Sequence, residues 1–152
     1  AREDGGRPAA ASRRRRAAER GLPMVCATPD RVVITGERRE FCAGALAEAY
    51  EALGGTVRWH GKPYPEVYER AQQVLADHLP VFDKSRVLCV GDGMETDMMG
   101  ARGAGLAAVF VLGGIHGEEI GRIGEAPDPE GLARVAARHG VAPIAALESF
   151  VW

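Results

Sequence analysis

Two carboxylates follow a short apolar run near the middle of the chain. Residues 86–90 read Arg-Val-Leu-Cys-Val, and Asp92 and Asp97 come directly after them, with Gly91 and Gly93 on either side of the first carboxylate. Glycine allows the backbone to turn sharply and to approach a ligand closely. Because ligands of parallel α/β sheets bind at the carboxyl ends of strands, the pattern predicts an acidic loop at the exit of a buried strand.

A cation is expected at a second strand exit. Lys62 lies between Gly61 and Pro63 and follows the strand-like residues 56–60. A lysine at such a place can neutralise phosphate charge as a compact cation, and carboxylates are ligands that Mg²⁺ prefers. We therefore expect this lysine and the acidic loop to meet at one edge of a parallel sheet and to form a magnesium–phosphate site.

Each of these residues also has a simpler structural interpretation. Asp92 alone is an ordinary turn aspartate, and Lys62 alone is a solvated turn lysine. Asp97, or Thr96 beside it, would stabilise the N-terminus of a helix that begins at residue 96. The combination of Gly-Lys-Pro with a Gly-Asp loop after a buried strand favours the functional interpretation.

The elements that would position these residues alternate between strand and helix. Strands are expected at 22–27, 32–34, 40–41, 56–60, 86–90 and 106–112, and helices at 9–19, 43–53, 65–79, 96–104, 118–123 and 129–139. We expect residues 124–129 to be a linker and the apolar tail to Trp152 to pack on the core. The alternation predicts an α/β fold with a parallel sheet that helices cover on both faces.

Composition limits the classes of function. The 152 residues are 46% apolar and 26% charged, and the net charge of -2 argues against nucleic acid as a partner. Four arginines at 13–16 could form a nucleic-acid patch, but a solvated helix face is the better interpretation. No apolar run is long enough to span a membrane. Three cysteines without a Cys-x-x-Cys pair indicate reduced thiols, and we expect a cytoplasmic protein without a membrane partner.

Five segments of the chain carry a resemblance to a known family. They cover much of residues 20–120, in the family's order, and are Cys-Ala-Thr-Pro-Asp at 26–30, Cys-Ala-Gly-Ala at 42–45, Gly-Lys-Pro-Tyr-Pro at 61–65, the loop 91–97 and Gly-Gly-Ile-His at 113–116. With these motifs the chain resembles the haloacid dehalogenase (HAD) superfamily, subfamily IIA. That subfamily includes p-nitrophenyl-phosphatase-like and nucleotide-phosphatase-like enzymes.

The resemblance implies a role for each candidate residue. Lys62 would hold the nucleophile and the phosphoryl group, Asp92 would be a Mg²⁺ ligand, and Asp97 would orient the metal shell or Lys62. The glycines that shape the loops are Gly61, Gly91 and Gly93. The implied activity is Mg²⁺-dependent hydrolysis of a small phosphorylated metabolite through an aspartyl-phosphate.

The resemblance also divides the chain into two parts. Residues 1–55 would be the C-terminal part of a cap domain, and residues 56–152 the second half of the catalytic core. Thr28 and Asp30 match the segment that returns from the cap and faces the substrate in this family. The family's usual residue before Pro-Asp is asparagine, so the contact made by that asparagine is not carried over to Thr28.

The family's first two motifs have no counterpart upstream of Lys62. The first is an apolar strand ending in Asp-x-Asp-Gly, whose aspartates act as nucleophile and as general acid and base, and the second supplies a serine or threonine. We therefore interpret the chain as a C-terminal fragment that is inactive alone and that self-associates through an open sheet edge. The alternative is a non-catalytic remnant that acts as a binding or interaction module, and the upstream coding sequence distinguishes the two.

The histidines do not indicate a zinc site. The spacings of His60, His78 and His116 fit no usual zinc pattern. His116, between Gly114 and Gly117, is the histidine that we expect near the acidic loop. The sequence leaves the substrate and the oligomeric state undefined.

Overall fold

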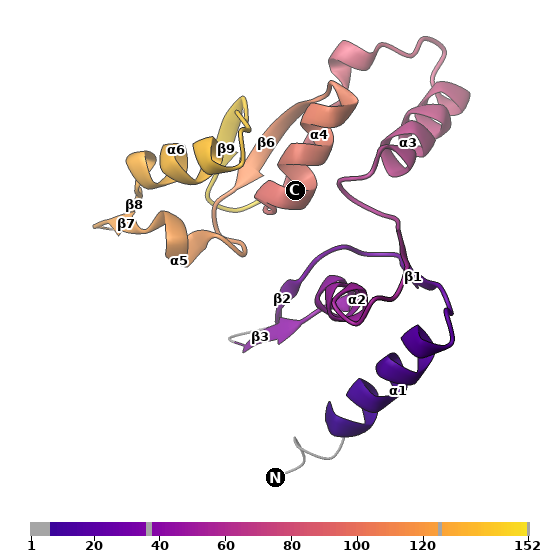
Figure 1. Ribbon diagram of the computed structural model, residues 1–152. Helices are drawn as coiled ribbons and strands as arrows, with labels where there is room; N and C mark the ends of the chain where they lie inside the picture. Colours follow the sequence, from indigo (N-terminus) through magenta and orange to yellow (C-terminus); the bar gives the residue numbers. More distant parts are fainter. Residues whose placement is uncertain (1–6, 36–37, 125, 152) are drawn as a thin grey trace. The chain divides into compact units, whose positions relative to one another are not determined.

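The chain divides into two compact units. The computed structural model describes residues 7–35, 38–124 and 126–151, and its two units divide between His60 and Gly61 (Figure 1). The predicted boundary at residues 55 and 56 falls earlier, because the strand Val57–Trp59 pairs within the first unit. That the units correspond to the end of a cap domain and to half of a catalytic core stays a prediction.

The described part of the first unit contains two helices and two small sheets. Its elements are α1 Arg7–Glu19, β1 Met24–Cys26, β2 Val32–Thr35, β3 Arg38–Phe41, α2 Ala43–Glu51 and β4 Val57–Trp59. Strands β2 and β3 form an antiparallel hairpin, and α2 buries Ala47 and Tyr50. The Tyr50 hydroxyl donates to the Leu22 carbonyl at 2.5 Å, which ties α2 to the chain before β1. Arg13 and Arg15 are exposed on α1, as expected for a solvated helix face.

Strand β4 does not enter the sheet that we expected. It pairs in parallel with β1, with Val57 opposite Met24 and Trp59 opposite Cys26. The prediction that residues 56–60 and 86–90 belong to one parallel sheet is therefore wrong for the described strands. The strand itself was predicted correctly, but pairing depends on residues distant in sequence, which a local pattern does not encode.

The second unit contains a parallel sheet with helical connections. Its elements are α3 Pro65–His78, the 3₁₀ turn η1 Lys84–Arg86, β5 Leu88–Gly91, the π-helical turn η2 Met94–Met98, α4 Met99–Ala104, β6 Ala107–Val111, α5 Gly117–Ile120, β7 Arg122–Ile123, β8 Ala126–Pro127, α6 Pro129–Arg138 and β9 Ala145–Leu147. The strand order is β5-β6-β9, and both pairings are parallel. The α/β class with a parallel sheet is confirmed.

Local sequence signals fix several helix ends. Asp128 precedes α6, and its carboxylate accepts from the Glu130 amide at 3.0 Å, while Pro129 occupies the first helical position. Gly105 ends α4 with φ of 64°, a left-handed conformation that glycine adopts without a steric penalty. The same logic places Pro65 at the start of α3.

One face of the sheet carries the core. Its buried cluster comprises Met94, Met98, Ala101, Ala108, Phe110, Ile120, Val135, Ala136 and Val141. Ala108 and Phe110 lie on the same side of β6, because side chains alternate along a strand, and α4 runs beside that strand (Figure 1). On the opposite side, Leu88 and Val90 of β5 are 50% and 37% exposed. Val109 of β6 faces the same side as Val90 and is buried, so the exposure is a feature of the edge strand β5.

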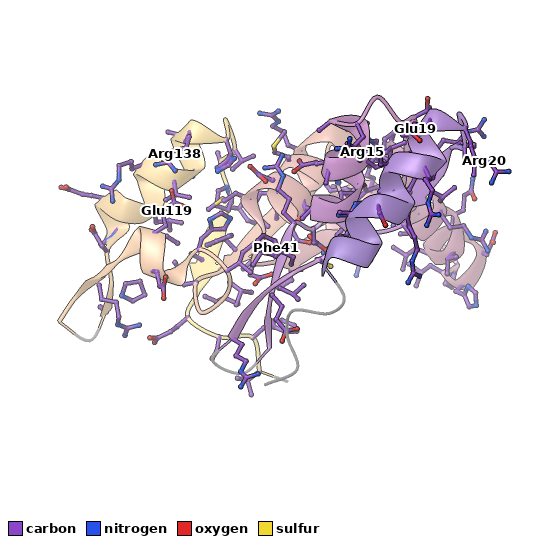
Figure 2. All side chains as sticks on the ribbon, turned by 60° about the horizontal axis from the view of Figure 1, so that its bottom comes forward. Arg15, Glu19, Arg20, Phe41, Glu119 and Arg138 are labelled. Carbon is purple, nitrogen blue, oxygen red and sulfur yellow. The ribbon has the colours of Figure 1, made fainter. Side chains whose placement is uncertain are left out.

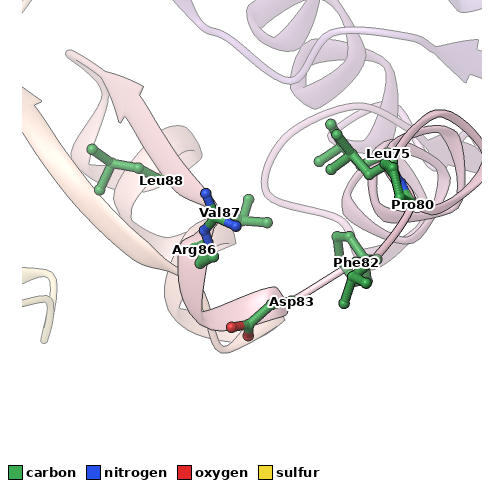
Figure 3. A pocket seen from close by; sticks show the side chains of 9 residues that line it. Leu75, Pro80, Phe82, Asp83, Arg86, Val87 and Leu88 are labelled. Atoms are coloured by element: carbon green, nitrogen blue, oxygen red, sulfur yellow. The ribbon is translucent and has the colours of Figure 1, made fainter.

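A hollow lies beside the exposed side of β5. It has a volume of about 580 Å³ and lies between the end of α3 and the start of β5, where Leu75 and Phe82 lie across from Val87 and Leu88 (Figure 3). Most of the residues that line the hollow are apolar, and the charged ones are Asp83 and Arg86.

Three local predictions need correction. The helix expected from residue 96 begins earlier, because Met94–Met98 forms a π-helical turn that leads into α4. The segment expected to be a helix end and a linker forms the antiparallel pair β7 and β8. The tail contributes β9 to the sheet, but Phe150 and Val151 are exposed rather than packed on the core, and Trp152 lies outside the described residues.

A helix that crosses a membrane needs about 20 predominantly apolar residues. Within residues 7–35, 38–124 and 126–151, no helix is long and apolar enough to cross a membrane.

Candidate active site

Lys62 and Asp97 form an ion pair in the second unit. Lys62 Nζ lies 2.5 Å from Asp97 Oδ1, and their side chains are 45% and 9% exposed. The second oxygen, Asp97 Oδ2, accepts from the Gly93 amide at 3.0 Å. Asp97 therefore connects the loop that precedes α3 to the loop that follows β5. This contact suits a residue that orients Lys62, although its catalytic role stays a prediction.

Asp92 is held by the loop that follows β6. Its Oδ2 atom accepts from the Ile115 amide at 3.2 Å. A side chain at Gly114 would overlap the Asp92 carboxylate, so the absence of a Cβ there allows the close approach. Lys62 contacts the acidic loop, as expected. The contact is made by Asp97, whereas the strands β4 and β5 that precede Lys62 and the loop belong to different sheets.

Steric contacts or a positive φ restrict each of the three predicted loop glycines. A Cβ at Gly91 would overlap the Asp97 carboxylate, and one at Gly93 would overlap the Thr96 hydroxyl. Gly61 has φ of 89°, which disfavours any residue with a side chain. These positions allow Asp97 to fold back over the loop after β5.

Tyr68 is a site residue that the sequence pattern missed. Its hydroxyl donates to the Thr96 carbonyl at 3.3 Å, and its ring packs against Gly100 of α4. Burial, and then the charge of Asp97, raises the pKa of Tyr68 to about 12. Tyr68 is the buried residue of α3.

Thr28 and Asp30 lie in the first unit. The Thr28 hydroxyl donates to Asp30 Oδ2 at 2.8 Å, and the Asp30 carbonyl accepts from the Gly44 amide at 3.0 Å. The two side chains are thus bonded to each other between β1 and β2, and the Asp30 backbone contacts the first turn of α2. Their expected role toward a substrate stays a prediction.

His116 contacts the acidic loop, as the sequence indicated. Its Nε2 atom accepts from the Met94 amide at 3.3 Å. His78, by contrast, bonds to the Val74 carbonyl at 2.8 Å within α3. His78 and His116 therefore have separate hydrogen-bond partners.

The donors of the acidic loop suit a magnesium ion. Both oxygens of Asp97 are engaged by protein donors, so Asp92 is the candidate ligand. Among the described residues no group of three histidines, cysteines or carboxylates could hold a metal ion. Mg²⁺ usually binds proteins through one or two carboxylates and keeps water or phosphate oxygens as its other ligands. A Mg²⁺ ligand set with the Asp92 carboxylate as its protein ligand is compatible with this coordination preference.

The chain belongs to the HAD-hydrolase-like family. The model of that family matches residues 59–143, which is more than half of the chain and includes Lys62, Asp92 and Asp97. No curated protein matches the chain.

Solved structures with a similar fold come from several organisms. A haloacid dehalogenase-like hydrolase from Brucella suis 1330 is 35% identical with a TM-score of 0.71, and the match covers 92% of this chain and 48% of that one. A p-nitrophenyl phosphatase from Archaeoglobus fulgidus is 24% identical with a TM-score of 0.64, covering 91% and 48%, and it shows the fold alone.

A glycerol phosphate phosphatase from Mycobacterium tuberculosis, in complex with magnesium, is 29% identical with a TM-score of 0.53. That match covers 69% of this chain and 30% of the phosphatase. The chain therefore spans about half, or less, of the length of these structures.

Proposed function

We propose that the chain is part of a Mg²⁺-dependent phosphatase of HAD subfamily IIA. The observation that carries the proposal is the Lys62–Asp97 ion pair, which brings a cation to the loop that bears Asp92. A cation beside a carboxylate that can hold Mg²⁺ suits a phosphoryl group, whose transfer depends on positioning and charge stabilisation.

Each residue has a defined part in the proposal. Lys62 neutralises the charge of the phosphoryl group, Asp97 holds Lys62 in place, and Asp92 binds the metal. Bound Mg²⁺ supplies further positive charge at the phosphate oxygens. The nucleophile is an aspartate on a segment outside these residues, since the sequence contains no Asp-x-Asp.

The substrate that we propose is a small phosphomonoester. Two of the similar structures are named p-nitrophenyl phosphatase and glycerol phosphate phosphatase, and the latter was solved with magnesium. These names support a small phosphorylated metabolite for this chain as well. A cytoplasmic location, with neither nucleic acid nor membrane as a partner, completes the proposal.

The test is hydrolysis of p-nitrophenyl phosphate by the polypeptide that the complete reading frame encodes. We expect turnover with Mg²⁺ and loss of turnover when EDTA removes the metal. Turnover that is equal with and without the metal would overturn the metal dependence. A complete product that lacks turnover would instead support the interaction-module alternative.

The 152-residue chain alone should be inactive in the same assay. Without a nucleophilic aspartate the covalent route is closed, so we expect no rate above that of buffer with Mg²⁺. Turnover by this chain that Asp92→Asn abolishes would show that a nucleophile lies within it.

A further inference from the structure

The loop that follows β6 supports the acidic loop at two points. The Ile115 amide donates to Asp92 Oδ2, and the neighbouring His116 ring accepts from the Met94 amide. Met94 is the first residue of η2, the turn that carries Asp97. One short segment after β6 therefore contacts the acidic loop on both sides of Gly93.

The hydrogen bond from Met94 defines the state of the His116 ring. A backbone amide can only donate, so Nε2 must be the unprotonated nitrogen. The other nitrogen, Nδ1, then carries the proton and donates to Glu119 Oε2 at 3.1 Å. The first amides of a helix have no partner within that helix, and Gly93 provides no side-chain cap. His116 supplies the acceptor that η2 lacks locally.

A second ion pair holds Glu119 in place. Arg138 of α6 pairs with Glu119 of α5, and the two side chains lie on neighbouring helices (Figure 2). The hydrogen bond from His116, and then Arg138, lowers the pKa of Glu119. The carboxylate is therefore charged near neutral pH and accepts a hydrogen bond from His116 Nδ1.

Packing restricts the His116 ring further. Its side chain is 14% exposed, with the Phe110 ring at 6.2 Å and the His139 ring at 5.9 Å between centroids. A ring that is packed by aromatic neighbours and hydrogen-bonded at both nitrogens has little freedom to rotate. Such a ring provides a fixed acceptor for the Met94 amide.

We propose that His116 is a positioning residue for the acidic loop, which it holds through the Met94 amide while Glu119 and Arg138 hold its ring. Its importance for phosphoryl transfer rests on the proposed function. The positioning of the loop by His116 is independent of the proposed function, because it depends only on contacts among η2, α5 and α6.

The first measurement is the protonation state of His116 in the full 152-residue chain, by long-range proton–nitrogen NMR at neutral pH. We expect a neutral ring with the proton on Nδ1. A proton on Nε2 would overturn the proposal, because Nε2 could then not accept from Met94. This measurement uses the unmodified chain and does not depend on the folding of a variant.

The second measurement is amide hydrogen exchange of Met94 and of the peptide covering residues 92–98. His116→Phe keeps a ring of similar size but removes the acceptor, and should speed exchange there roughly threefold to tenfold. His116→Gln restores an acceptor near the Nε2 position and should return exchange toward the rate of the unmodified chain. The matched control is His78→Phe, whose ring bonds only within α3 in the described contacts.

Equal exchange in the His116→Phe variant and the unmodified chain would contradict the proposal. Equal acceleration by the Phe and Gln substitutions would also contradict it, because only lost packing would then explain the effect. Neither outcome depends on turnover of p-nitrophenyl phosphate. A failure of the proposed function and a failure of this inference are therefore separable.

Discussion

The Asp97 carboxylate joins segments that are far apart in the sequence. One oxygen binds Lys62 and the other accepts from the Gly93 amide, and the side chain is nearly buried. A buried acceptor with two donors contributes more to stability than an exposed ion pair, because its loss leaves the Gly93 amide without that partner.

Asp97→Ala should lower the free energy of unfolding by about 1–3 kcal/mol. Lys62→Met should cost less than about 1 kcal/mol, because the lysine is half exposed and water screens its charge. Urea denaturation of both variants measures the difference. A larger loss for the lysine variant than for the aspartate variant would contradict this order.

Tyr68 should make stability depend on alkaline pH. Its pKa is raised to about 12 from the usual 10.0 in the folded chain, so the folded state binds the phenolic proton more tightly than the unfolded state does. This contribution is complete below pH 10.0 and is lost as the pH rises toward the folded value. Stability should therefore fall by about 1 kcal/mol per pH unit within this window.

The free energy of unfolding is measured at a pH near 9 and near 11.5 for the unmodified chain and for Tyr68→Phe. The quantity compared is the loss of stability between the two pH values in each chain. The Phe variant should lose less stability on going to the higher pH. An equal loss in both chains would show that other groups, such as lysines, explain the alkaline dependence.

Among the elements, α3 and α4 pack through a glycine. A Cβ at Gly100 would overlap the Tyr68 hydroxyl, whereas a Cβ at Gly103, in the same helix, would meet nothing within 4 Å. The two positions therefore separate helix propensity from packing. Alanine favours a helix over glycine at both, but only position 100 would be overpacked.

Gly100→Ala should lower the melting temperature, because overpacking costs about 1–3 kcal/mol and exceeds the gain in propensity. Gly103→Ala should leave the melting temperature unchanged or raise it, with a gain of up to about 1 kcal/mol. Thermal unfolding of the two variants decides the matter. Shifts of the same sign would mean that the Tyr68 contact does not limit position 100.

The local sequence pattern predicted most helices and strands but not which elements they pair with or pack against. Residues 56–60 were recognised as a strand, yet their pairing with β1 depends on a segment some thirty positions away. At the early start of η2, the Met94 amide donates to His116, a partner outside the local sequence. The buried side of α3 depends on Gly100 of α4, and so Tyr68 was missed.

The candidate site was more predictable than the sheet order. Lys62, Asp92 and Asp97 follow short runs with glycines beside them, and these local signals do not require knowledge of strand pairing. Their proximity was expected from one shared sheet. It arises instead from the ion pair and from the Gly93 amide.

At the scale of the whole molecule, the edge of β5 is the exposed feature. Within the described strands β5 pairs only with β6, and Leu88 and Val90 lie on its uncovered side. Exposed apolar strand edges pair with other chains, and apolar side chains left in water contribute nothing to stability. We therefore expect the isolated chain to self-associate, to be marginally stable, or both.

Sedimentation of the purified chain at several concentrations tests this expectation, with thermal unfolding beside it. Val90→Lys places a charge at the edge and should shift the chain toward monomer, whereas Val67→Lys, on the exposed side of α3, should not. A monomer with a single sharp transition that is independent of concentration would contradict the expectation.

The central claim is that Asp92, brought together with Lys62 by Asp97, forms part of a magnesium–phosphate site. The most direct measurement is kcat/KM for p-nitrophenyl phosphate, with Mg²⁺, of the polypeptide from the complete reading frame. We expect Asp92→Asn to lower it by at least about 100-fold, while the matched control Asp77→Asn, at an exposed position of α3, changes it by less than about twofold. An Asp92→Asn variant that keeps the rate of the unmodified enzyme would contradict the account.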